Sequence, residues 1–182
     1  MASAEGILFE GLKALAFYEQ RFAKPLIGAF EGTDMAPHAY LSDLFVRIPQ
    51  SYREEAAKLA LLHIVNSCEH CPSPKDVRSI LADAVLKTQQ LSFSSLYEKA
   101  KFFLAFPPET PEAAGEWINR VIFSSIRHLG RERFTIVTEE EWSIAVADVI
   151  FGDVELVQYI PNPKKAPTLK QHDFKKLLNT KQ

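Results

Sequence analysis

Glycine, cysteine and long apolar runs are all scarce in this chain of 182 residues. With only seven glycines, it offers no glycine-rich loop of the kind that cradles phosphate groups, and it contains neither a Gly-x-Ser-x-Gly nor a His-Glu-x-x-His motif. No apolar run approaches the ~18 residues that a membrane-spanning helix needs. The first residues lack the basic start of a secretory signal. These absences predict a non-enzymatic cytoplasmic protein without a cofactor, a membrane or a small-molecule substrate.

The two cysteines, Cys68 and Cys71, lie three positions apart and cannot cross-link distant parts of the fold. Such usage favours a reducing compartment. With His63 and His70 nearby, the pair has the ligand types of a zinc site, but a second ligand pair at zinc-site spacing is missing and only His128 is left over. A thioredoxin-type pair starts a helix, whereas this pair is expected to end one. We expect a helix end here, and keep a metal site with Cys68 and Cys71 as the alternative.

Helix signals dominate the residues that are present. Apolar residues make up 47 per cent of the chain and recur at three- and four-residue spacing in several segments. Gly130 is placed to close one of these helices. Helix starts are expected at four capping sequences: Ser51 with Glu54, Ser73 before Pro74, Thr110 before Pro111, and Thr138 with Glu141. The sequence therefore predicts an all-α bundle of six to seven helices, with at most a short strand pair near 134–160.

Breaks in these patterns suggest four regions. Residues 1–101 form an N-terminal helical half, 102–111 a connector, 112–160 a C-terminal helical half, and 161–182 a proline-spaced tail. The net charge of -2 hides an asymmetry, because the tail carries six lysines and one acid. Such polarity predicts a tail with a role of its own, although a solvated end that keeps the chain soluble has the same composition.

A run of basic residues in the C-terminal half is the candidate nucleic-acid contact. Arg120 and Arg127 are seven positions apart and share one helix face, and Arg131 and Arg133 follow just past the expected helix end. Clustered cations of this kind contact phosphates. Cations also favour the negative end of a helix dipole, so a solvated helix end is the competing interpretation.

The tail is the candidate partner-binding segment. Its apolar residues sit at the spacing of a helix that docks into a groove, and lysines are interleaved with them. Packing of these residues onto the protein's own body is an equal alternative. The expected contacts are Lys164, Lys165, Lys170, Phe174, Lys175, Lys176, Leu177 and Leu178.

Several motifs resemble the small helical replication proteins of bacteriophages that load or restrain the replicative helicase. The shared pattern is an aromatic helix, a helix with an Ala-Leu pair, a proline-containing turn into an Asp-Val-Arg helix start, and a later tryptophan helix with an Ile-Arg-x-Leu-Gly stop. In this chain these are Tyr40–Phe45, Ala60–Leu61, Cys71–Arg78, and Ile126–Gly130 after Trp117. The resemblance covers residues 8–86 and 117–130. The family usually has tryptophan in place of Phe45 and an aromatic residue in place of Cys71.

The resemblance implies a DNA-replication adaptor with no enzymatic activity. Its helical N-terminal half would bind DNA or an initiator, and residues 161–182 would contact a hexameric helicase. The residues alone leave open a helical interaction scaffold or chaperone-like protein with no nucleic-acid role, for which Phe102, Phe103 and Phe106 are the candidate contacts. They also leave open an enzyme whose cleft is assembled from distant residues, since such a cleft has no local motif.

Overall fold

The structure is a computed structural model that describes residues 3–17, 36–68 and 71–161. Within these residues it has nine helices and no strand, which confirms the all-α prediction. Seven helices have eleven residues or more, and the count exceeds the predicted range because two short helices, α7 and α9, add to them. The elements are α1 (Ala4–Phe17), α3 (Pro37–Arg47), α4 (Gln50–Ser67), α5 (Pro74–Thr88), α6 (Phe93–Ala105), α7 (Pro111–Gly115), α8 (Trp117–Leu129), α9 (Arg131–Phe134) and α10 (Glu139–Ile150).

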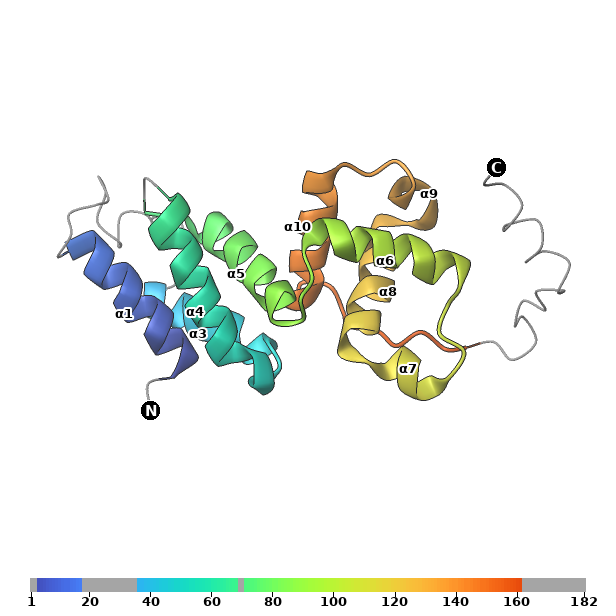
Figure 1. Cartoon of the computed structure of the whole chain (residues 1–182), viewed down its shortest axis with the longest axis horizontal. Helices are drawn as coiled ribbons and strands as arrows, with labels where there is room; N and C mark the ends of the chain where they lie inside the picture. Colours follow the sequence, from blue (N-terminus) through green and yellow to red (C-terminus); the bar gives the residue numbers. More distant parts are fainter. Residues whose placement is uncertain (1–2, 18–35, 69–70, 162–182) are drawn as a thin grey trace, which may run out of the picture.

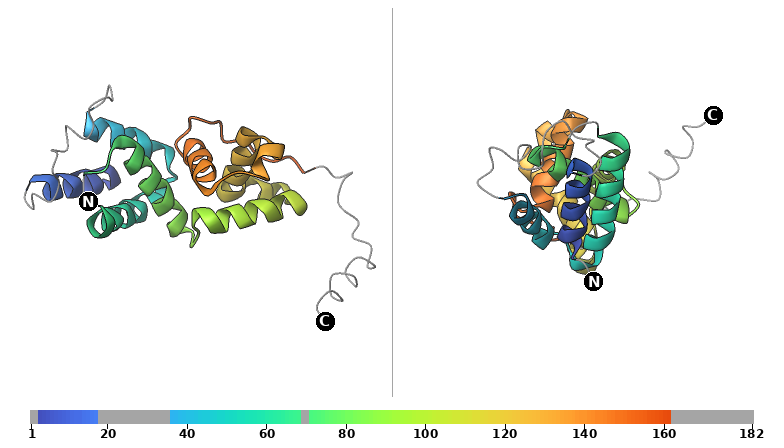
Figure 2. Two further views of the ribbon diagram at one scale, coloured as in Figure 1. Left: turned by 90° about the horizontal axis from the view of Figure 1, so that it is seen from above. Right: turned by 90° about the vertical axis from the view of Figure 1, so that its left-hand side faces the viewer.

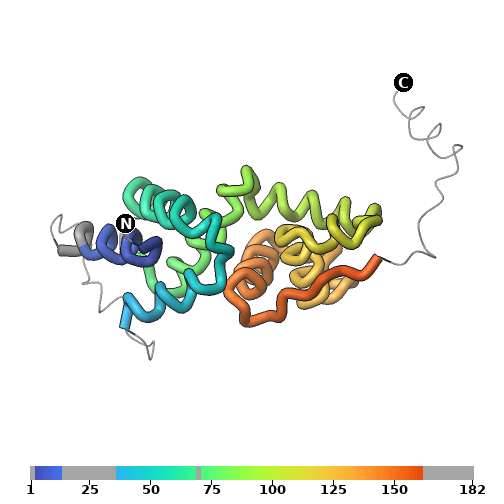
Figure 3. Tube along the Cα trace, turned by 90° about the horizontal axis from the view of Figure 1, so that it is seen from below, coloured from blue at the N-terminus to red at the C-terminus, as the bar shows by residue number. Residues whose placement is uncertain are grey.

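The sequence allowed at most a short strand pair near 134–160, and the described residues form no strand there. Residues 131–134 form α9, which buries Phe134, and a turn leads from it to α10. Residues 154–161 run without regular secondary structure beside α8, where backbone groups bond to side chains instead of a second strand. Figure 3 shows this red segment passing along the C-terminal helices. The apolar runs of both segments reflect burial against helices, not sheet formation.

Four helices, α1, α3, α4 and α5, form an N-terminal group (Figure 1). Helix α4 packs against α1 and α5, and α1 also packs against α3. Small residues permit the close approach of α1 to α4. A Cβ placed on Gly11 would lie only 2.5 Å from the Leu61 side chain. The core of this group includes Leu8, Leu12, Leu41, Phe45, Ala57, Ala60 and Leu81, all almost fully buried.

The remaining helices form a C-terminal group around α8, which packs against α6, α7, α9 and α10. An aromatic cluster of Tyr97, Phe134 and Trp142 holds α6, α9 and α10 together, with ring centroids 5.1 to 5.6 Å apart. Trp142 is buried, and its indole N–H donates a hydrogen bond of 2.9 Å to the carbonyl oxygen of Phe93. This bond satisfies the one polar group of an otherwise apolar side chain.

The two groups meet where α5 packs against α10. Figures 1 and 2 show the chain passing from α5 to α6 through a short turn, with the two groups side by side. The turn contains Gln90, whose φ of 56° is the one positive φ of a non-glycine residue in the described part of the chain. The expected connector at 102–111 is partly helical, because residues 102–105 belong to α6 and α6 packs against α8 and α10. The helix groups therefore separate at 89–92.

Most of the expected helix starts are confirmed. Ser73 and Thr138 each form a complete capping box, and the Thr110 hydroxyl accepts a hydrogen bond from the amide of Ala113. Gly130 closes α8 with a φ of 82°.

The capping box at Ser51 was wrong, because the N-cap of α4 lies two residues earlier, at Pro49, and the helix begins at Gln50. Arg53 turns back and donates hydrogen bonds to the carbonyl oxygens of Val46 and Ile48 at the end of α3. Glu54 pairs with Lys58 at 2.8 Å instead of reaching the helix start.

Candidate binding groove and helix junction

A groove of about 540 Å³ lies between α6, α8 and the segment that follows α10. Its lining is mainly apolar, and the two charged residues that line it are both arginines. The lining residues are Phe103, Leu104, Pro107, Phe123, Ile126, Arg127, Gly130, Arg131 and Tyr159. An apolar lining with a few cations is typical of a binding site rather than of a surface that only faces water.

Three aromatic rings line this groove. Phe103 is nearly parallel to Phe123, with centroids 6.2 Å apart, and Tyr159 meets both rings edge-on at 5.5 and 5.4 Å. Phe103 is 6 per cent exposed, while Phe123 and Tyr159 are half-buried. The three rings therefore contact one another, and Phe103 is almost entirely covered.

The segment that carries Tyr159 is fixed to α8 and α7 by side-chain hydrogen bonds. Arg120 donates to the carbonyl oxygen of Leu156 at 2.9 Å, and the Ser124 hydroxyl accepts from the amide of Val157 at 2.9 Å. The Gln158 amide group donates to the carbonyl oxygen of Pro111 at 3.0 Å. These bonds replace the sheet ladder that the segment lacks, and they position Tyr159 as one wall of the groove.

The structure separates the four arginines that the sequence grouped as a nucleic-acid contact. Arg127 and Arg131 line the groove and are exposed. Arg120 is half-buried and holds Leu156, and Arg133 forms an ion pair of 2.5 Å with Glu141 of α10. Only two of the four guanidinium groups therefore line the groove without a bonding partner in the described residues.

Those two arginines also stand apart from the others in the described part of the chain. Five of its seven arginines bond to a carboxylate or a backbone carbonyl: Arg47, Arg53, Arg78, Arg120 and Arg133. Arg127 and Arg131 have no such partner among the described residues. Both line one groove, so the two arginines that the fold leaves without a bonding partner in the described residues lie close together there.

Apolar surface continues beside the groove at the end of α6. Phe102 and Phe106 flank the groove residue Phe103 in the sequence, and their side chains are 63 and 44 per cent exposed. Their rings pack against each other with centroids 5.0 Å apart. Two adjacent exposed phenylalanines are unusual on a surface that only faces water, and they favour contact with another molecule.

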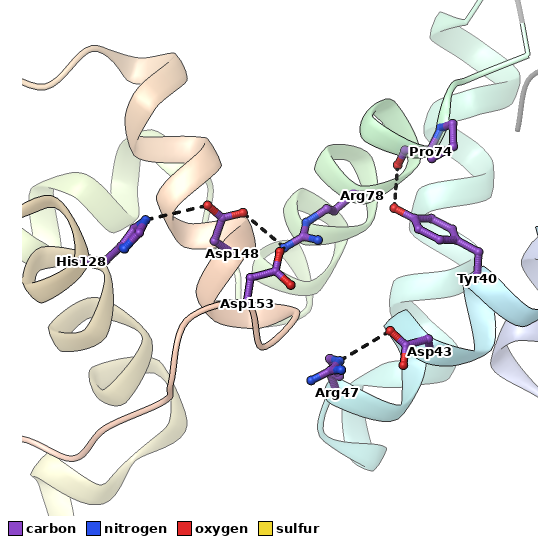
Figure 4. A network of polar contacts seen from close by, with 8 residues as sticks. All are labelled: Tyr40, Asp43, Arg47, Pro74, Arg78, His128, Asp148 and Asp153. Carbon is purple, nitrogen blue, oxygen red and sulfur yellow. Dashed lines mark hydrogen bonds and ion pairs between the residues drawn. The ribbon is translucent and has the colours of Figure 1, made fainter. Parts of the chain in front are cut away.

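A second cleft, of about 580 Å³, lies at the junction of α3, α5 and α10. Figure 4 shows the polar contacts around Arg78, Asp148 and Asp153, three of the charged residues that line it. Arg78 of α5 forms ion pairs with Asp148 of α10 and with Asp153, and Asp148 also lies 3.9 Å from the Nε2 atom of His128 in α8. The guanidinium of Arg78 also lies over the ring of Phe151, 5.3 Å from its centroid. This network links three helices from both groups.

Residues of α3 complete this junction (Figure 4). The Tyr40 hydroxyl donates to the carbonyl oxygen of Pro74 at 3.1 Å, and burial raises the pKa of Tyr40 above its ordinary value of 10.0. Arg47 pairs with Asp43 at 3.6 Å and lies against Gly152. The ion pairs of Arg78 connect α5 with α10 and with the segment after it, so this part of the junction fits the joining of the two groups. The sequence did not reveal this network, because its members come from distant segments; Arg78 and Asp153, for example, are 75 positions apart.

The cysteines end α4 as expected. Cys68 is the C-cap residue, and the side chains of Cys68 and Cys71 are both partly buried. Burial, with a smaller contribution from Cys68, raises the pKa of Cys71 to about 11. In the described ranges, which omit His70, no three His, Cys, Asp or Glu residues are grouped so as to hold a metal ion.

Other sequence expectations have different outcomes. The eight partner-binding residues of the tail, from Lys164 to Leu178, lie outside the described residues. In the described ranges, no helix combines the length and apolarity required to cross a bilayer.

The chain matches no family model, no curated protein and no solved structure. The resemblance to phage replication proteins therefore depends on the short motifs alone.

Proposed function

We propose that this protein is a non-enzymatic adaptor that binds an anionic macromolecular partner in the groove between α6 and α8. One observation carries the proposal: the two arginines without a bonding partner in the described part of the chain, Arg127 and Arg131, line the same apolar groove. A partner with an apolar surface and a negative charge would find an apolar contact and a pair of cations in the same groove.

The chemistry of the groove supports binding over catalysis. Its lining residues include no carboxylate, imidazole or thiol, and its one hydroxyl group belongs to Tyr159. General acid–base or nucleophilic catalysis needs such groups within hydrogen-bond reach of each other. Arginines placed on an apolar rim instead recognise anions by paired N–H donors.

The replication role expected from the motif resemblance is part of this proposal. In that role the anionic partner would be a segment of a hexameric helicase, or single-stranded DNA held near it. The lysine-rich residues 161–182 begin two positions after the groove residue Tyr159 and would act beside the groove. A shift in the sedimentation of a replicative helicase hexamer on mixing with the full chain would support this role, and co-sedimentation of neither helicase nor DNA would remove it.

Single-stranded nucleic acid is the second candidate ligand, favoured by the two arginines and the neighbouring aromatic rings. Two phosphate contacts predict a slope of about -1.4 for log affinity against log salt, or a loss of about sevenfold from 50 to 200 mM salt. Contacts from all four predicted arginines would give a loss of about 50-fold over the same range. The structure favours the smaller figure, because Arg120 and Arg133 already have partners.

The side-chain Nε–H resonances of the arginines test the proposal directly. The isotope-labelled full chain is titrated with a helical peptide of glutamate and leucine, and separately with oligothymidine. We expect the signals of Arg127 and Arg131 to shift with at least one of these polyanions. The signal of Arg120 should not shift with the same dependence on ligand concentration. Unchanged Arg127 and Arg131 signals with both ligands would refute the proposed function.

A further inference from the structure

The lining of the groove distinguishes between the two classes of anionic ligand. Stacking of nucleic-acid bases needs aromatic faces that are open to the ligand. Here Phe103 and Ile126 are 6 and 5 per cent exposed, and Phe123 and Tyr159 meet edge to face. Leu104 and Pro107 complete an aliphatic and aromatic surface. Such a lining matches the apolar side chains of a protein segment better than stacked bases.

The local structure also determines which conformation the segment can adopt. Strand addition needs an exposed sheet edge, and the described residues contain no sheet. A groove bordered by two helices is the usual site for a third, amphipathic helix whose anchors lie three and four positions apart. The exposed pair Phe102 and Phe106, at the end of α6, adds apolar surface for a second anchor beside the groove.

Charge determines the composition of that helix. Arg127 and Arg131 have no described partner, so the occupant must supply carboxylates at the edge of its apolar face. The chain's own residues 161–182 are a poor match, because they carry six lysines and a single acid and would be repelled by both arginines. The uncompensated charge therefore favours a partner in trans.

We propose that the groove binds an acidic amphipathic helix of a partner protein, with an apolar anchor above Phe123 and Ile126 and carboxylates paired with Arg127 and Arg131. This inference rests on the proposed function and specifies its ligand. It predicts specificity for Asp or Glu on the turn next to the anchor, and it makes the two guanidinium groups the main determinants of affinity.

A displayed library of random peptides of about 16 residues, roughly four helical turns, is a probe that does not require the partner to be known. It is selected on the full chain and on a variant with Arg127→Ala and Arg131→Ala whose helix content is verified by circular dichroism. We expect enriched peptides with a net negative charge and apolar residues at i and i+3 or i+4. Synthetic versions should bind the double variant about tenfold or more weakly than the wild type.

Two further variants make this experiment specific. Arg127→Lys with Arg131→Lys keeps the charge but removes the planar N–H pairs, so it should lose part of the affinity. Lys99→Ala removes an exposed cation from α6 outside the groove and should bind like the wild type. Equal weakening by Lys99→Ala would show a nonspecific charge effect and overturn the inference.

The possible outcomes separate the inference from the proposed function. Enriched peptides that are not acidic, or that bind both arginine variants unchanged, overturn the inference. Arginine signals that shift only with oligothymidine identify nucleic acid as the ligand, which overturns the inference and leaves the proposed function standing. If sedimentation shows a dimer of the wild type that dissociates in the double alanine variant, a second copy of the chain is the occupant. That result also overturns the inference and leaves the proposed function standing. No response to peptides, oligothymidine or a second copy refutes both.

Discussion

Arg78 of α5 and Asp148 of α10 are 70 positions apart in the sequence, and their side chains form an ion pair of 3.2 Å. Both side chains are mostly shielded from water, with 22 and 27 per cent of their area exposed. Because α5 belongs to one group of helices and α10 to the other, this pair joins the two halves of the molecule. Because the pair is shielded from water, its loss should change the free energy of unfolding more than the loss of an ion pair on an open surface.

Replacement of Arg78 should destabilise the fold. Arg78→Ala leaves Asp148 and Asp153 facing each other without their cation, and we expect a loss of about 1–3 kcal/mol in the free energy of unfolding. Urea denaturation followed by circular dichroism measures it. Lys58→Ala is the control, since it breaks an ion pair whose side chains are 55 and 64 per cent exposed. Equal stability of Arg78→Ala and wild type would show that the junction does not depend on this pair.

Substitution of Gly130 should destabilise the end of α8 through the backbone alone. Its φ of 82° is unfavourable for other residues, and no atom lies within 4 Å of an added Cβ. Gly130→Ala should therefore lose about 1–3 kcal/mol of unfolding free energy. Gly115→Ala is the matched control, because Gly115 ends α7 without a positive φ and has room for a methyl group. The two variants are compared by thermal unfolding, and similar melting temperatures would contradict the prediction.

The stability of the protein in acid should depend on Glu141. A hydrogen bond from the backbone amide of Thr138 and one from Arg133 lower the pKa of this carboxyl below its ordinary value of 4.5. A lowered pKa in the folded state adds stability that is complete above the ordinary pKa and disappears as pH falls through the folded value. Glu141→Gln should therefore be less stable than the wild type at pH 7.

That difference should shrink as the pH falls below the ordinary carboxyl pKa of 4.5. Denaturant midpoints measured across this range give the comparison. The control Glu139→Gln removes a carboxylate from the same first turn of α10 but leaves the capping box at Thr138 intact. A Glu141→Gln difference that stays constant with pH would mean that the carboxylate charge makes no contribution.

Cys71 should react slowly with alkylating reagents. Burial, together with the neighbouring Cys68, raises its pKa to about 11, and only the thiolate reacts. At pH 8 the fraction of thiolate should be about 100-fold smaller than for a thiol with the ordinary value of 9.0. Iodoacetamide labelling of Cys68→Ser, followed by mass spectrometry over a pH series, measures the rate. A midpoint near 9 would show that Cys71 is open to water.

The sequence predicted those features that depend on neighbouring residues. The capping boxes at Ser73 and Thr138 each close within four positions, so their residues are visible together in the sequence. Ser51 shows the limit of this approach. It has the same pattern, but Arg53 and Pro49 move the helix start because they respond to the end of the preceding helix. Local rules fail where a tertiary contact competes with them.

The candidate site could be predicted only in part, for the same reason. Arg127 and Arg131 were identified from their charge and spacing, and they do line a groove. Nothing near Arg120 in the sequence indicates that it holds Leu156, which lies 36 positions later. The apolar lining combines α6, α8 and Tyr159, so it exists only after these segments pack. The pairing of Arg133 with Glu141 likewise depends on how α9 turns into α10.

The bonds from Arg120 and Ser124 that anchor residues 156–157 also determine how the end of the chain relates to the groove. Residue 161 comes two positions after Tyr159, so a partner that bound the lysines of the tail would be tethered within a few nanometres of Arg127 and Arg131. Two weak attachments to the same assembly would then reinforce each other through a high local concentration, by roughly 100-fold or more. Loosening this anchor would leave each attachment intact and weaken their combination.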